Sequence, residues 1–217
     1  MFCEDESQPT LINCMFQANS AEGIGGAMQI HNKTKVILAN CLFSGNSARD
    51  VGGAIYNENK SHVSLTNCAF VSNTSSGIAG CIFNKEDSSS RLTNCILWGN
   101  TDAKNDLESA QIQCGTIIVN NCCIQTWTGR LGGTANFGLN PLFIDPDGPD
   151  NKIGTADDNL RLDLAFPCCN AGDNSALPAD TADLDKDGDV NEPIPFDIEG
   201  KPCILNGIVD LGAYEGN

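Results

Sequence analysis

The sequence has little positive charge and no long apolar run. Its 217 residues include 28 Asp and Glu against 12 Lys and Arg, which gives a formal net charge of −16 at pH 7. A nucleic-acid-binding surface requires the opposite sign of charge, and an anionic membrane surface would repel this chain. No apolar run approaches the ~18 residues that a membrane-spanning helix needs. We therefore expect no nucleic-acid partner and no membrane insertion.

The sequence also lacks amphipathic helical periodicity and a secretory signal. No stretch of about ten residues repeats apolar positions at helical spacing. Met1 is followed by Phe2, Cys3 and Glu4, which does not resemble a signal peptide. We expect that export information was removed or that the chain is the C-terminal part of a longer protein.

What the sequence does have is a repeat of 27 residues. Apolar residues stand two positions before and two positions after an Asn-Cys pair, and another Asn follows five positions after the Cys in the first four copies. This alternation is strand periodicity. A period of this length without helices is typical of a solenoid. The Asn-Cys pairs lie at 13–14, 40–41, 67–68, 94–95 and 121–122.

The repeat predicts an all-β fold, a right-handed parallel β-helix in which each 27-residue coil adds one layer. Leu65 and Phe70 belong to opposite strand phases and both should face inward, so the chain must bend between them. Asn67 tolerates the left-handed conformation of such a corner, and Cys68 suits the buried position beyond it. A second corner is expected at the glycine pairs. The residues expected to stack in the core are Leu65, Cys68 and Phe70 on Leu38, Cys41 and Phe43.

The chain divides into a repeated and an irregular part. The coils occupy residues 1–126, whereas residues 127–217 are rich in Gly, Pro and Asp. Residues 139–217 carry 17 acidic and 4 basic residues. Because repeat arrays need a terminal unit over their open end, we expect 127–217 to form irregular last coils and an acidic, loop-rich C-terminal cap packed on the solenoid.

Of the twelve cysteines, five belong to the Asn-Cys pairs of the repeat. Stacked cysteines of the repeat should lie about one strand spacing apart, ~4.8 Å, which exceeds the ~3.5–4.5 Å between the Cβ atoms of a disulfide. We therefore expect buried thiols in the column. Cys168, Cys169 and Cys203 lie outside it and are the better disulfide candidates.

Several motifs carry a family resemblance. Gly-Gly-Ala at 25–27 and 52–54 and Phe-x-x-Asn at 16–19, 43–46 and 70–73 resemble the repeats of polymorphic outer-membrane-protein passenger domains. The closer resemblance is to bacterial secreted right-handed parallel β-helix repeat proteins. Residues 210–215 match their Asp-x-Gly-Ala-Tyr-Glu ending. Residues 140–145 and 167–172 resemble the segments that usually precede this ending. The resemblance implies an extracellular or cell-surface protein from a group in which most members have no assigned activity.

Two acidic loops predict structural calcium sites that would hold the cap in place. The loop from residue 183 places oxygens at positions 1, 3, 5, 7 and 9 with Gly at 6, as in an EF-hand. Glu192 follows, but the twelfth position is Ile194 and not an acid. The alternative is a solvated acidic loop. The expected ligands are Asp183, Asp185, Asp187, Asp189 and Asn191 in this loop, and Asp145, Asp147, Asp150, Asp157 and Asp158 in the other.

Catalysis has weak support in the sequence. His31 and His62 are not a whole number of repeats apart, and neither lies near a pattern typical of a catalytic triad. No two coils place acids at the same strand position. We expect a non-catalytic structural, adhesion or carbohydrate-binding role, with a polysaccharide-degrading lyase or glycoside hydrolase as the alternative. Expected partners are a glycan or a surface protein, and further copies of the chain joined end to end through the uncapped N-terminal coil.

Overall fold

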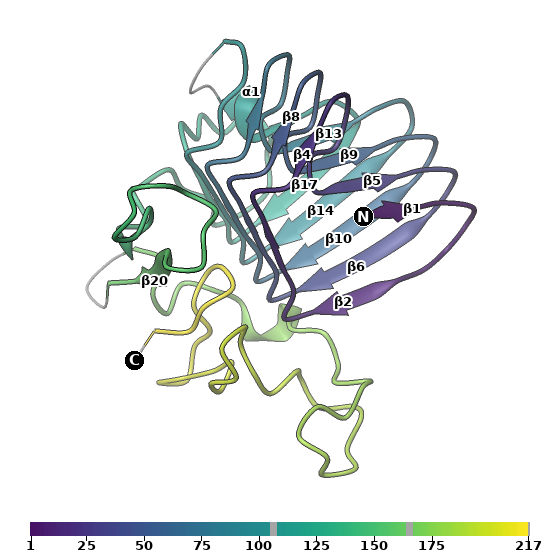
Figure 1. Ribbon diagram of the computed structural model, residues 1–217. Helices are drawn as coiled ribbons and strands as arrows, with labels where there is room; N and C mark the ends of the chain where they lie inside the picture. The colour runs from purple at the N-terminus through teal and green to yellow at the C-terminus, as the bar shows by residue number, and fades with distance from the viewer. Residues whose placement is uncertain (105–107, 164–166, 217) are drawn as a thin grey trace.

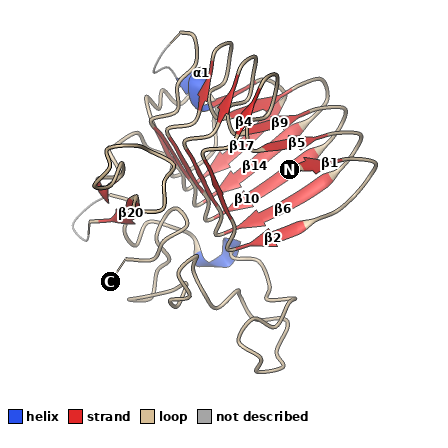
Figure 2. Ribbon diagram, in the orientation of Figure 1, coloured by secondary structure: helices blue, strands red, loops and turns tan. Residues whose placement is uncertain are grey.

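A computed structural model describes residues 1–104, 108–163 and 167–216, and the fold is a parallel β-solenoid of about four turns with coils of ~27 residues (Figure 1). This confirms the all-β β-helix predicted from the repeat. Strands form the walls of the solenoid and loops make up most of the C-terminal part (Figure 2). The described helices are too short and too polar to cross a membrane.

Four stacks of parallel strands form the solenoid. The first sheet contains β1 (Phe2–Cys3), β5 (Met28–Ile30), β9 (Ile55–Asn57), β13 (Ile82–Asn84) and β16 (Ile112–Gln113). The second contains β2 (Thr10–Ile12), β6 (Lys35–Ala39), β10 (His62–Thr66), β14 (Ser89–Thr93) and β17 (Thr116–Asn120). The third contains β3 (Met15–Gln17), β7 (Leu42–Ser44), β11 (Ala69–Val71), β15 (Ile96–Trp98) and β18 (Cys123–Ile124). The short fourth contains β4 (Ser20–Ala21), β8 (Ser47–Ala48) and β12 (Thr74–Ser75).

The strand register follows the repeat, with one local exception. Leu65 pairs with Leu38 and Phe70 with Phe43, each 27 residues apart. In the fourth coil the glycine corner is lost and the short helix α1 (Glu108–Gln111) precedes β16, so that Ile82 pairs with Ile112. The normal spacing returns in the next sheet. Residues 105–107 lie outside the described residues.

The predicted core residues are buried and stacked. Leu65, Cys68 and Phe70 are at most 1% exposed. The ring of Phe43 is sandwiched between those of Phe16 and Phe70, with centroid distances of 4.6 Å on both sides. The predicted corner is also confirmed, because every Asn of the Asn-Cys pairs has a positive φ. These residues are Asn13, Asn40, Asn67, Asn94 and Asn121.

The Asn that follows five positions after the Cys in the first four copies of the repeat forms a buried amide ladder inside the solenoid. Asn73 Oδ1 accepts hydrogen bonds from the backbone N–H of Asn46 at 3.0 Å and from its side-chain amide at 2.8 Å. Asn73 Nδ2 donates to Phe43 O at 2.9 Å and to Asn100 Oδ1 at 2.9 Å. The ladder satisfies polar groups that would otherwise be buried without partners.

The glycine corner allows a close approach between coils. A Cβ on Gly53 would lie 2.0 Å from Gly80 O and 2.3 Å from Thr74 O. No side chain fits there, so only glycine permits the coils to stack at this spacing.

Residues 127–138 cover the C-terminal end of the solenoid. The backbone N–H of Asn121 donates to Thr134 O at 2.9 Å, and that of Phe137 donates to Cys122 O at 3.0 Å. Trp127 packs against the main core from this end. The end expected to need a cap is therefore covered by a short segment that continues the last coil.

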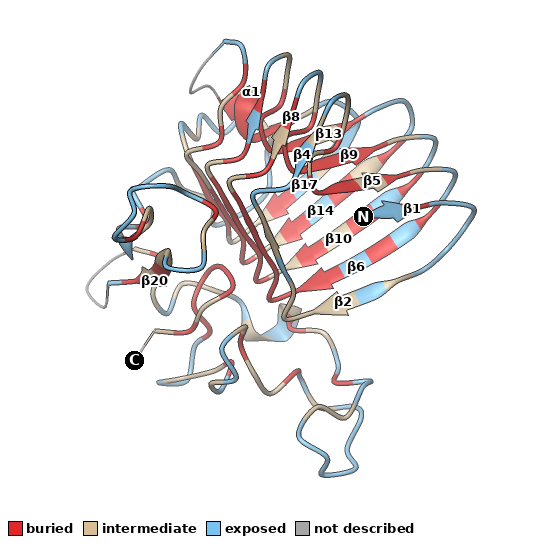
Figure 3. Ribbon diagram, viewed as in Figure 1, coloured by how far each residue is buried: buried red, intermediate tan, exposed pale blue. Residues whose placement is uncertain are grey.

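Most of the remaining chain lies along the side of the solenoid and not over its end (Figure 1). We call residues 139–216 the lateral segment; it includes the antiparallel pair β19 (Phe143–Asp145) and β20 (Asn159–Leu162) and the 3-10 turn η1 (Asn174–Ala176). It packs on outward-facing residues of the third sheet, which are therefore buried (Figure 3). The contacting residues are Leu42, Ala69, Ile96 and Cys123 on the sheet, and Leu160, Leu162, Leu211 and Ala213 in the segment.

The Asp-x-Gly-Ala-Tyr-Glu ending holds the lateral segment together. Asp210 accepts backbone N–H groups of Asn170 at 2.6 Å and Gly216 at 2.8 Å. Glu215 accepts those of Leu205 and Asp210, both at 2.9 Å. Both carboxylates are 3% exposed. Burial raises the pKa of Glu215 to about 7, because the two N–H donors only partly offset the loss of solvent.

The lateral cysteines do not form the expected disulfides at Cys168 and Cys203, which carry free thiols. Cys203 Sγ accepts a hydrogen bond from Asn40 Nδ2 at 3.2 Å. Cys168 packs beside Cys123 in an apolar cluster. Both thiols therefore serve as contacts between the lateral segment and the solenoid.

Candidate functional site

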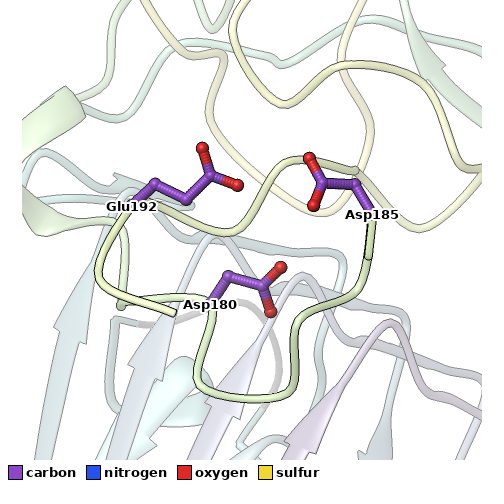
Figure 4. A group of neighbouring side chains, drawn as sticks. All are labelled: Asp180, Asp185 and Glu192. Atoms are coloured by element: carbon purple, nitrogen blue, oxygen red, sulfur yellow. The ribbon is translucent and has the colours of Figure 1, made fainter. Parts of the chain in front are cut away.

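Three carboxylates converge in the acidic loop 179–194 (Figure 4). Asp180, Asp185 and Glu192 each place an oxygen within 4.8 Å of the others. The base of the loop is closed by an antiparallel bridge, in which the Asp180 N–H donates to Glu192 O at 2.7 Å and the Ile194 N–H donates to Pro178 O at 2.9 Å. Backbone pairing therefore sets the positions of two of the three acids.

The ligands predicted from the EF-hand-like spacing are brought together only in part. Asp183, Asp185 and Asp187 form a second group within 4.8 Å, which shares Asp185 with the first. Asp189 and Asn191 belong to neither group. Asp183 Oδ1 accepts the Gly188 N–H at 3.1 Å, and the carboxylates at 185, 187 and 189 each accept the N–H two residues later. Much of the motif thus caps its own backbone.

The EF-hand-like spacing does not include Asp180, and Glu192 is not among the ligands expected from it. Asp180 precedes the EF-hand-like spacing by three residues, and Glu192 falls at its tenth position, where no ligand is expected. The bridge between Ala179 and Pro193 brings these two acids together. No periodicity in the sequence predicts this bridge. The one weak signal for it is that each end of the loop has an acid next to an apolar residue, Ala179-Asp180 and Glu192-Pro193.

The other predicted loop arranges three of its acids around a hydroxyl. Thr155 Oγ1 lies 2.5 Å from Asp157 Oδ1, 3.1 Å from Asp158 Oδ1 and 3.5 Å from Asp150 Oδ1. Carboxylates only accept hydrogen bonds, so the hydroxyl donates to one at a time. The hydrogen bond from Thr155 lowers the pKa of Asp157.

Asp145 and Asp147, the first two predicted ligands of that loop, lie apart from this arrangement. Asp145 ends β19 and pairs with Asn159 across the antiparallel sheet. Among the described residues, the groups of three acids with metal-type spacing lie in the 179–194 loop only. Calcium binding by the earlier loop stays a prediction.

A separate polar cluster lies on the outer face of the first sheet. Glu58 forms an ion pair with His31 Nδ1 at 2.7 Å and another with Lys85 Nζ at 3.2 Å, and it accepts a hydrogen bond from Tyr56 Oη at 2.6 Å. Successive coils supply His31, Glu58 and Lys85, which are 27 residues apart. This column was not predicted, although the 27-residue spacing was a sufficient signal, because the residue one repeat after His31 is Glu58.

Aromatic rings flank this charged column. Tyr56 stacks on Phe83 with a centroid distance of 5.9 Å, and the ring of Phe2 lies 4.9 Å from that of His31. We call the whole set the outer ladder. Its members are Phe2, His31, Tyr56, Glu58, Phe83 and Lys85.

The outer ladder fixes the ionisation of its central groups. Burial disfavours the Glu58 anion, but the hydrogen bonds from Tyr56 and Lys85 and the charge of His31 outweigh it, so the pKa of Glu58 is lowered. Burial and the neighbouring carboxylate raise the pKa of Tyr56 to about 12. At neutral pH the ladder therefore holds a carboxylate anion beside a protonated phenol.

Comparison of the chain with protein-family models, curated proteins and solved structures gives no match. Function must therefore be inferred from the residues of the outer ladder and the acidic loop.

Proposed function

We propose that this chain is a non-catalytic, extracellular or cell-surface solenoid that binds carbohydrate through the outer face of its first sheet, in an adhesion or structural role. The observation that carries the proposal is the outer ladder, in which a column of aromatic rings lies beside the charged column of His31, Glu58 and Lys85.

The chemistry of the outer ladder suits sugar rings. A sugar presents apolar C–H faces bordered by hydroxyl groups. Phe2, which is 55% exposed, and the half-buried Phe83 offer aromatic surface to such faces. Glu58 and Lys85 offer an acceptor and donors to the hydroxyls, and charged partners make such hydrogen bonds stronger.

The position of the outer ladder suits an extended polymer. The lateral segment lies on the side of the solenoid away from β5 and β9 (Figure 1). Coils follow one another at about 4.8 Å, so ladder groups recur along the solenoid axis. A chain of sugars laid along this face could contact several coils at once.

A polysaccharide-degrading enzyme is the second candidate, and one observation favours it. Glu4 occupies the column of His31 one coil earlier, because Cys3 pairs with Ile30. Glu4 and Glu58 therefore share one column two coils apart, contrary to the expectation that no two coils place acids at the same position. Their backbones are about 10 Å apart, close to the ~6.5–9.5 Å between carboxyl groups of inverting glycosidases. Against it, a hydrolase needs a proton donor with a raised pKa, and the pKa of Glu58 is lowered.

A glycan array combined with a reducing-sugar release assay tests the proposal. We expect binding without sugar release, weakened at least about tenfold in Phe83→Ala because an aromatic platform is removed. The matched control is Ile37→Ala, which trims an exposed apolar residue on the outer face of the second sheet. Sugar release that is abolished by Glu58→Gln would establish the enzyme instead. Absence of binding to any glycan would overturn the proposal.

A further inference from the structure

Two buried carboxylate oxygens of the acidic loop have no hydrogen-bond partner. Asp180 is fully buried; its Oδ2 accepts the Leu184 N–H at 2.7 Å, whereas its Oδ1 accepts nothing. Glu192 Oε1 is also buried without a partner. A buried carboxylate oxygen with no donor is costly, and two of them in one loop require an explanation.

These oxygens belong to side chains that face a common space. Figure 4 shows the carboxylates of Asp180, Asp185 and Glu192 directed toward one another from three sides of the loop. No ion pair found among the described residues includes any of the three.

We propose that Asp180, Asp185 and Glu192 form a binding site for a hard divalent cation of the calcium type. All available donors are oxygens, which excludes the sulfur and nitrogen ligands typical of zinc. Calcium takes about six to eight oxygens in flexible geometry, whereas magnesium demands a near-ideal octahedron. Ligands spread over a 13-residue span of loop suit the more tolerant ion.

The proposed site differs from the one that the EF-hand-like spacing predicts. In that motif Asp183, Asp185, Asp187 and Asp189 each use an oxygen to accept a backbone N–H of the loop, and Asp180 does the same through Oδ2. The unpartnered buried oxygens lie instead on Asp180 and Glu192. The ion is therefore expected at the base of the loop, with Asp185 shared between the two groups.

The base of this loop is attached to the solenoid. Ile194, next to the bridge, packs with Ala39 and Val209 in an apolar cluster between the lateral segment and the second sheet. Asn40 Nδ2 donates to Phe196 O at 2.8 Å two residues further on. A cation at the loop base would thus stiffen a docking point of the lateral segment, independently of any glycan bound at the outer ladder.

Calorimetric titration of the full chain, freed of metal with chelator, tests the site with calcium and with magnesium. We expect calcium binding, weaker magnesium binding, and at least about tenfold weaker calcium affinity in Asp180→Asn because one anionic ligand is lost. Asp189→Asn is the matched control, since Asp189 is exposed and belongs to neither group of acids; its affinity should be unchanged.

Thermal unfolding separates loss of the ion from loss of the fold. Without metal, Asp180→Asn should melt at or above the wild-type temperature, because it removes one of three mutually repelling charges. Calcium should raise the melting temperature of the wild-type chain by mass action, and at the same calcium concentration it should raise that of Asp180→Asn clearly less. Two results would overturn the site: no calcium response in the wild-type chain, or loss of binding in Asp183→Asn with retention in Asp180→Asn.

Discussion

In the solenoid, core side chains pack on their equivalents in the neighbouring coils, whereas in the lateral segment no residue has such an equivalent. Phe43 lies between Phe16 and Phe70 at the same distance on both sides. Glu215, by contrast, holds two different stretches of backbone through single contacts. Each coil of the solenoid repeats the same packing of core side chains, whereas the lateral segment depends on a few individual polar groups. The first region should therefore resist changes of pH and ions that the second does not.

The largest effect is expected from truncating the central aromatic of the solenoid. Phe43→Ala should lower the free energy of unfolding by about 3–5 kcal/mol, because it leaves a cavity between two stacked rings. Denaturant titration followed by circular dichroism measures the change. Phe2→Ala, on a residue 55% exposed, is the control. A loss below about 1 kcal/mol at Phe43 would contradict a core built by stacking.

The buried amide ladder should come next. Asn73→Ala removes the acceptor of both the backbone N–H and the side-chain amide of Asn46. At about 1–3 kcal/mol for each unsatisfied buried group, the loss of an acceptor for these two donors should cost at least about 2 kcal/mol by the same titration. Asn59→Ala is the control, because Asn59 Nδ2 donates a hydrogen bond to Asn32 Oδ1 between exposed corners of neighbouring coils. Equal losses in the two variants would show that burial of the ladder does not matter.

The two regions also differ in how far they could be predicted. The solenoid repeats each constraint, so five Asn-Cys pairs sufficed to predict the left-handed corner at Asn67 and the burial of Cys68. The outward apolar residues under the lateral segment were missed, although Cys41, Leu42 and Phe43 are consecutive apolar residues, as expected of a strand buried on both faces. The single-copy parts offered no such redundancy.

The candidate sites show the same contrast. The column of His31, Glu58 and Lys85 could have been found from the 27-residue spacing alone. The convergence of Asp180 with Glu192 could not, because it depends on the bridge between Ala179 and Pro193. The EF-hand-like spacing predicts a site in the same loop as the cation site proposed above, but it selects acids that accept N–H groups of their own loop.

A pH effect of intermediate size is expected in the lateral segment. The pKa of Glu215 is raised to about 7 from an ordinary value of 4.5, so the folded chain binds a proton that the unfolded chain has released between these values. This contribution to stability is complete below about pH 4.5 and is lost as the pH rises through about 7. Asp210, whose pKa burial also raises, acts in the same direction.

Hydrogen exchange at about pH 5 and pH 8, corrected for intrinsic rates, measures this effect. Peptides covering residues 195–216 should be better protected at the lower pH, and Glu215→Gln should flatten the difference. Peptides from β6 to β15 are the internal control. A lateral segment that is equally protected at both values would contradict the role given to Glu215.

The smallest effect is expected at the N-terminal coil. β1, β2, β3 and β4 each end their sheet, and Met1, Phe2 and Met15 are 52%, 55% and 49% exposed. Open strand edges beside apolar surface favour pairing with another chain. Light scattering over a concentration series should detect weak self-association, reduced by Met15→Glu but not by Ile208→Glu in the lateral segment. A monomer at all concentrations would contradict this prediction.

Hydrogen exchange with and without calcium tests most directly whether the two regions are stabilised differently. After metal is removed with chelator, we predict faster exchange in residues 173–216 and unchanged exchange in the inner coils from β5 to β15. Adding calcium back should restore the slower rates. Exchange that is unchanged throughout, or that rises equally in the solenoid and the lateral segment, would contradict the account.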